Sequence, residues 1–87
     1  MHELSLFKDI LNKIESISQD NEGKKIVKMK VRLGALSHLS ASHFQQHFDQ
    51  FSIGTKAEGA DLEIVEDNDQ SAPYAQSIVL ESVEIDA

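Results

Sequence analysis

The sequence predicts a small two-layer α+β fold, in which two helices pack on a mixed three-stranded sheet in the order α-β-α-β-β. Two segments carry apolar residues at the spacing of a helix buried on one face, and three segments alternate in polarity or are rich in β-branched residues. One helical segment separates the first two strands, as in a parallel crossover. The 87 residues suffice for one small core, so we expect residues 1–87 to form a single domain.

The first helix is expected over residues 3–18. Leu4, Phe7 and Leu11 begin a series of apolar residues at spacings of three and four, which is typical of a helix packed on one side. The polar segment 19–23 ends in a glycine, a residue that commonly ends a helix.

The first strand is expected over residues 26–33, because its side chains alternate in character. Four apolar side chains at alternate positions are predicted to face the core: Val27, Met29, Val31 and Leu33. The opposite face carries three cations: Lys28, Lys30 and Arg32. We expect a solvated face without specific ion pairs. The alternative is that these cations pair across the sheet with acids of the later strands: Asp61, Glu63, Glu81 and Glu84.

The second helix is expected over residues 40–52, preceded by serines that can cap it and followed by Gly54. Phe44, Phe48 and Phe51 stand at positions i, i+4 and i+7, which predicts an aromatic stripe on one side of this helix.

Two further strands are expected over residues 60–66 and 77–85. Leu62 and Ile64 alternate with acids in the earlier strand, whereas the apolar residues at the start of the later strand do not alternate and leave its register open. The connection of residues 67–76 is short and rich in turn-forming residues, which favours antiparallel pairing between these two strands.

Composition excludes several classes of partner and site. The net charge of -7 repels phosphate, so neither nucleic acid nor an anionic membrane is expected as a partner. The chain has no cysteine, so no disulfide and no thiolate zinc site is expected. No apolar run approaches membrane-spanning length or resembles the core of a signal peptide, and we expect a cytoplasmic location.

The first three residues, Met1, His2 and Glu3, form a candidate metal site. A histidine one residue from a free α-amine can chelate a metal together with that amine and the backbone amides that begin the helix. This nitrogen-rich set suits square-planar Ni(II) or Cu(II). Because amine and imidazole must both lose their protons, binding is expected to weaken below about pH 6. Glu3 also has a structural explanation, since an acid in the first turn complements the helix dipole.

His43 and His47 stand at i and i+4 on the second expected helix and are a candidate secondary metal pair. A partly buried position at the edge of the phenylalanine stripe explains them without a metal. A metallohydrolase motif has a glutamate directly after its first histidine, whereas Phe44 follows His43 here and Gln45 and Gln46 precede His47. His38 is assigned no function. The chain carries no nucleophile elbow, phosphate loop or dinucleotide motif, and we expect no catalytic residue and no enzyme activity.

Several short motifs of the chain are similar, in kind and in order, to one known family. They are Met1-His2-Glu3-Leu4-Ser5-Leu6, Leu33-Gly34-Ala35-Leu36, Gly54-Thr55, Ala57-Glu58-Gly59-Ala60 and Leu62-Glu63-Ile64-Val65. Together they resemble HypA/HybF, the nickel-insertion chaperones of NiFe hydrogenase and urease maturation. The resemblance implies transient Ni(II) binding by the Met1 amine, His2 and Glu3. It also implies delivery to a maturation partner, either a HypB-like GTPase or the hydrogenase large subunit.

The chain departs from this family between its second and third expected strands. Members of the family carry a zinc lobe there, built from two Cys-x-x-Cys pairs, whereas residues 67–76 form a short connection without cysteine. Two functions are therefore considered: a nickel metallochaperone, and a metal-independent adaptor that keeps the fold and docks to a basic partner. Exchange of the last strand between two copies would form a dimer, so monomer and dimer both stay open.

Overall fold

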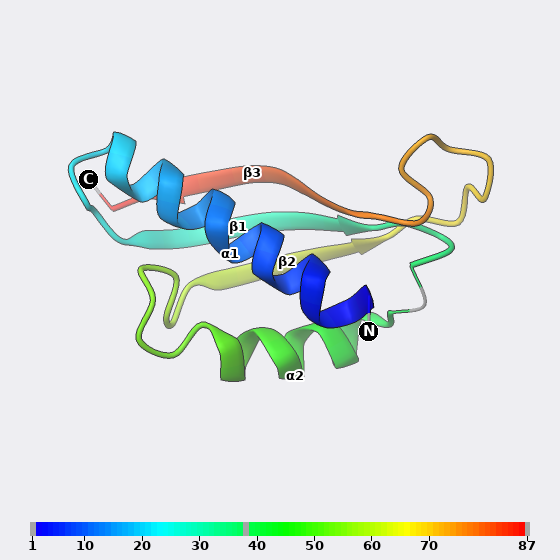
Figure 1. Ribbon diagram of the computed structural model, residues 1–87, viewed down its shortest axis with the longest axis horizontal. Coiled ribbons are helices and arrows are strands. Elements are labelled where there is room, and N and C mark those ends of the chain that lie inside the picture. Colours follow the sequence, from blue (N-terminus) through cyan, green and yellow to red (C-terminus); the bar gives the residue numbers. More distant parts are fainter. Residues whose placement is uncertain (1, 38, 87) are drawn as a thin grey trace.

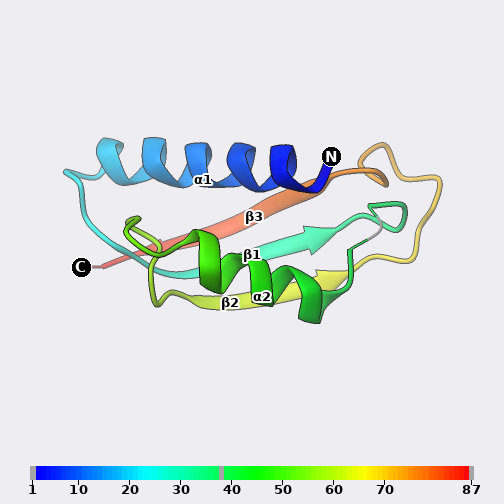
Figure 2. The same cartoon turned by 60° about the horizontal axis from the view of Figure 1, so that its bottom comes forward.

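The computed structural model describes residues 2–37 and 39–86, and for residues 2–4 and 6 the backbone alone. Its elements follow the order α1 (His2–Asp20), β1 (Ile26–Leu33), α2 (Ala41–Phe51), β2 (Asp61–Glu66) and β3 (Ile78–Ile85). Both helices cover the same face of the sheet, with α2 over the β2 side and α1 over the β3 side (Figures 1 and 2). The predicted two-layer α+β fold is confirmed.

The sheet has the strand order β2-β1-β3, with β1 in the centre. β1 and β2 pair in parallel, as a crossover through α2 requires. β1 and β3 pair antiparallel, from Ile26 opposite Ile85 to Leu33 opposite Ile78. The expected antiparallel pairing of the second and third strands is therefore wrong.

The connection between β2 and β3 explains this arrangement, because it crosses the end of β1. Asp67 N–H donates to the Leu33 carbonyl and Gly34 N–H donates to the Ser77 carbonyl, both at 2.9 Å. The chain thus leaves β2 on one side of β1 and begins β3 on the other. In that position the apolar side of β3 adds Ile78, which is 7% exposed, to the core.

The inward face of β1 differs from the prediction at one residue. Val27, expected inside, is 43% exposed, and Ile26 is buried in its place. The register of β1 against β3 shifts between Ile26 and Lys28, an irregularity that leaves two consecutive residues on the outer side. A second shift, between Lys30 and Val31, accounts for the broken alternation within β3.

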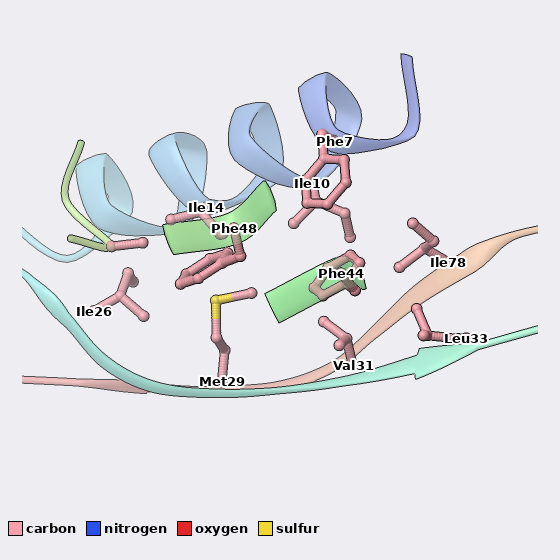
Figure 3. Packing of buried hydrophobic residues seen from close by; sticks show 11 residues of the cluster. Phe7, Ile10, Ile14, Ile26, Met29, Val31, Leu33, Phe44, Phe48 and Ile78 are labelled. Atoms are coloured by element: carbon pink, nitrogen blue, oxygen red, sulfur yellow. The ribbon is translucent and has the colours of Figure 1, made fainter. Parts of the chain in front are cut away.

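The core lies between the sheet and both helices (Figure 3). The rings of Phe7 from α1 and Phe44 from α2 stack with centroids 4.7 Å apart, which ties the N-terminal halves of the two helices together. Phe48 is buried beside them, whereas Phe51 is 37% exposed at the margin of the stripe. Neither described helix is long and apolar enough to cross a membrane.

Candidate metal site

The predicted nickel ligands stand at the start of α1. Met1 lies outside the described residues. The backbone of His2 and Glu3 forms the first turn of the helix, and their side chains are not among those described. The first N–H groups of a helix have no carbonyl partner within it, so a chelate can use them without breaking a helical hydrogen bond. The ligand set itself stays a prediction.

The second helix begins at the same end of the molecule as α1, and both helices run in the same general direction from there (Figures 1 and 2). Ser40 caps α2, because its side chain accepts a hydrogen bond from His43 N–H at 3.2 Å. The stacking of Phe7 on Phe44 holds the two helix starts in register. The first turn of α2 is therefore fixed both by its cap and by its packing on α1.

His43 and His47 are brought together on α2. Their Nε2 atoms lie 3.0 Å apart, and their rings meet edge to face at 86°. His43 is exposed and His47 is half-buried, with the His47 ring 5.6 Å from Phe7 and 5.9 Å from Phe51 between centroids. The helical spacing predicted that both imidazoles point the same way. The contact with Phe7 of the other helix was missed, because no local pattern reports which residues of two helices meet.

The described part of the chain holds no larger cluster of metal ligands. Among its side chains, no three histidine, cysteine, aspartate or glutamate residues converge closely enough to hold an ion. The His43–His47 pair is therefore a two-ligand set within the described residues. The N-terminal set is not tested by this finding, because it depends on side chains outside them.

The outer face of the sheet carries cross-strand charge pairs, the alternative to a solvated face without specific pairs. Lys30 Nζ lies 3.7 Å from a Glu63 carboxylate oxygen across β1 and β2. Arg32 bonds through Nε to Glu81 across β1 and β3. Lys28 of β1 lies opposite Asp61 of β2 and Glu84 of β3 in the register. Among the described residues, these three form no ion pair.

Asp67 anchors the connection between β2 and β3, a role that sequence reasoning missed. Its carboxylate accepts a hydrogen bond from Asp69 N–H at 3.0 Å and lies 3.5 Å from the Arg32 guanidinium. The pKa of Asp67 is lowered, chiefly by the bond from Asp69 N–H and further by Tyr74 and Arg32. The charge of Asp67 in turn raises the pKa of Tyr74. An aspartate two residues before another polar residue is a known signal for such a turn.

We predict that removing the Asp67 charge destabilises the protein more at neutral pH than in acid. Because the folded pKa lies below the ordinary value, the carboxylate contributes stability above about pH 4. That contribution is lost as the pH falls through the lower folded value. Asp67→Asn should therefore lower the melting temperature clearly at pH 7 and much less at pH 3. Thermal melting followed by circular dichroism checks this.

Asp61→Asn is the matched control, because it removes one exposed acid of β2 that has no ion pair among the described residues. Both variants change the net charge of this acidic chain equally, so the difference between their melting temperatures excludes that effect. Equal losses of melting temperature for Asp67→Asn at both pH values would contradict the prediction.

Comparison with known proteins links the chain to nickel incorporation. The family model described as hydrogenase/urease nickel incorporation, metallochaperone, hypA matches residues 1–72. Hydrogenase maturation factor HypA of Aquifex aeolicus is 36% identical over 62 residues, covering 71% of this chain and 54% of that protein. The same factor of Acidithiobacillus ferrooxidans is 38% identical over 65 residues, covering 75% and 58%. That of Archaeoglobus fulgidus is 34% identical over 64 residues, covering 74% and 58%. The chain thus spans little more than half the length of these relatives.

Proposed function

Because the chain belongs to the HypA family of hydrogenase/urease nickel-incorporation metallochaperones, we propose that it binds one Ni(II) at its N-terminus and delivers it to a metalloenzyme maturation partner. The family consists of maturation factors, and this protein is not an enzyme. The proposed ligands are the Met1 amine, the imidazole of His2 and the backbone amides of His2 and Glu3. Nickel is the cargo of this site and is held only transiently.

The observation that carries the proposal is the start of α1 at His2. The amides that the chelate needs fall in the one turn of the helix where N–H groups lack an intrahelical acceptor. The positive end of the helix dipole opposes a cation there by about 0.3–1 kcal/mol. Ionised amides and the Glu3 carboxylate offset that cost, and the net charge of -7 favours a cation over an anion.

We propose a HypB-like GTPase or the hydrogenase large subunit as the partner that receives the metal in the cytoplasm. The matched relatives are hydrogenase maturation factors, which favours hydrogenase as the target, and the family description also includes urease. The given sequence has no cysteine, so no thiolate zinc site of its own can take part in delivery. The ligands alone do not select nickel, because nitrogen donors bind Cu(II) more tightly in the usual order, so supply by the cell sets the metal.

We predict that blocking the Met1 amine by acetylation weakens nickel binding about as much as His2→Ala, by at least about tenfold. Each change removes one nitrogen from the chelate, the first by acylating the amine and the second by deleting the imidazole. Isothermal titration of untagged protein with Ni(II) measures both effects. Intact-mass analysis of the native protein establishes that Met1 carries the required unmodified amine. Ser5→Ala, at an exposed position of α1, is the control and should bind nickel normally.

Unchanged nickel affinity in the acetylated chain would reject the terminal site. The metal-independent adaptor is separated from the chaperone by measuring binding to a HypB-like GTPase with and without Ni(II). An adaptor would bind this partner equally well as the His2→Ala variant and without metal. A chaperone would transfer one equivalent of nickel to the partner, and the variant would not.

A further inference from the structure

We propose that His43 and His47 form a second divalent-metal site, in which the Nε2 atoms of both imidazoles bind one ion. The pair uses none of the proposed N-terminal ligands, and its existence does not rest on the proposed function. Two imidazole nitrogens suit borderline ions such as Ni(II), Cu(II) and Zn(II). Water or a donor from a partner completes the coordination.

The spacing of the two nitrogens fits the adjacent positions of a metal's coordination sphere. The Nε2 atoms of His43 and His47 are 3.0 Å apart. For metal–nitrogen bonds of about 2.0–2.1 Å, this separation corresponds to an angle of about 90–100° at the metal. That angle is the one between neighbouring ligands in square-planar and octahedral sites. The separation therefore fits one shared ion, and the rings would turn so that both Nε2 lone pairs point toward it.

The surrounding contacts hold the pair in place before any metal binds. The His47 ring is packed against Phe7 of α1 and Phe51 of α2. The backbone of His43 is fixed by the Ser40 cap. Phe44, next to His43 in the chain, is fully buried and anchors this turn of α2 in the core. Because the rotamer and the backbone are already restricted, binding costs less conformational entropy than in a flexible pair.

A metal bound to both Nε2 atoms would replace the hydrogen bond between the two rings. At 3.0 Å, Nε2–H of one neutral ring donates to Nε2 of the other. To bind one ion through both Nε2 atoms, the donating ring moves its proton to Nδ1, the other tautomer of neutral imidazole. α2 itself carries no lysine or arginine that would repel the ion.

The position of the pair near the start of α1 would allow it to exchange an ion with the proposed N-terminal site. Phe7, which contacts His47, follows His2 by about 7.5 Å of helix rise. The second site therefore lies near the start of α1, and an ion can pass between the two sets of nitrogens without travelling far. This exchange, unlike the site itself, rests on the proposed function.

The test isolates the pair in the His2→Ala chain, which lacks the imidazole of the terminal chelate. Zn(II), which is diamagnetic, is titrated into this protein while the imidazole resonances of His43 and His47 are followed by NMR. Both should shift together at one equivalent of metal. His43→Gln and His47→Gln should each weaken zinc binding by about 10²-fold, because one donor of a two-donor site is lost. Calorimetry measures that change.

The matched control keeps the number of histidines and breaks their spacing. In the double variant His47→Gln with Gln50→His, the two imidazoles stand seven residues apart, about 10.5 Å along the helix. It should bind zinc as weakly as His47→Gln alone. Circular dichroism of every variant checks the helix, and His43→Gln, at an exposed position, keeps the test valid if His47→Gln disturbs packing.

Absence of zinc binding by the His2→Ala chain would overturn the proposal. Full affinity in His43→Gln, or in the double variant with displaced histidines, would overturn it as well. Either result would leave the proposed N-terminal site standing. That site is measured separately, by nickel binding that depends on His2 in a protein with both α2 histidines intact. Unchanged nickel affinity in His2→Ala, with zinc still bound at α2, would reject the proposed function alone.

Discussion

Phe44→Ala is expected to lower the free energy of unfolding by about 3–5 kcal/mol, the largest effect of any single change considered. Phe44 is 0% exposed and its ring stacks on Phe7, so the truncation leaves a cavity between the two helices and the sheet. The stacked pair adds about 0.5–1.5 kcal/mol beyond the buried area. Single domains have roughly 5–15 kcal/mol of stability in total, so this loss is a large fraction of it.

Urea denaturation followed by circular dichroism measures this effect. Phe51→Ala is the matched control, since the same side chain is removed from the same helix at a position that is 37% exposed. It should cost clearly less than Phe44→Ala. Similar losses for the two variants would show that the stack of Phe7 on Phe44 is not the centre of the core.

Gly34→Ala is expected to cost about 2–4 kcal/mol and to loosen the connection between β2 and β3. A Cβ at Gly34 would lie 2.3 Å from the Ala75 carbonyl oxygen and 2.5 Å from the Tyr74 carbonyl oxygen. Both are backbone atoms, which cannot move aside without moving the chain. The clash would disrupt the nearby bond from Leu36 N–H to the Ala75 carbonyl, now 2.7 Å long.

Gly54→Ala separates this steric effect from the backbone effect of replacing glycine. Gly54 has a φ of 82°, and an added Cβ there meets nothing within 4 Å. Its replacement should therefore cost only the strain of a left-handed residue, about 1–2 kcal/mol. Denaturation measures both variants, and hydrogen exchange of Leu36 N–H should accelerate in Gly34→Ala alone. Equal exchange rates would mean that the connection can shift to accept the methyl group.

The close approach at Gly34 explains how the end of the sheet is built. The connection is bonded to β1 by its backbone, and Arg32 adds ion pairs to Asp67 and Glu81 on the outer face. The resemblance to HypA places the zinc lobe of that family at this point. In the described chain, hydrogen bonds and ion pairs hold β1 and the connection together there.

Several features of the fold followed from local pattern alone. Apolar spacing in α1 and α2 gave their extents to within two residues, because a helix buried on one face repeats with its own period. Ser40 was among the serines expected to cap α2, and the structure selects it. The spacing of His43 and His47 likewise placed both imidazoles on one side of α2, since i and i+4 are neighbours on a helix.

The features that local pattern missed depend on contacts between distant segments. Val27 was assigned to the core by alternation, but a shift in the pairing of β1 with β3 turns it outward. The path of the chain from β2 across the end of β1 depends on the space left by Gly34 and on the bonds of Asp67. Neither can be derived from the turn-rich composition of residues 67–76, because composition predicts a turn and not its direction.

The two candidate metal sites also differ in whether local sequence or tertiary packing determines them. The chemistry of Met1, His2 and Glu3 is local, since one chain end supplies all of its nitrogens, and so it was readable from the order of the residues. The environment of the His43–His47 pair arises only when α1 packs on α2, because Phe7 fixes the His47 ring from a helix more than thirty residues earlier in the chain. Periodicity records how each segment presents its own side chains, whereas packing determines which other segment each side chain meets.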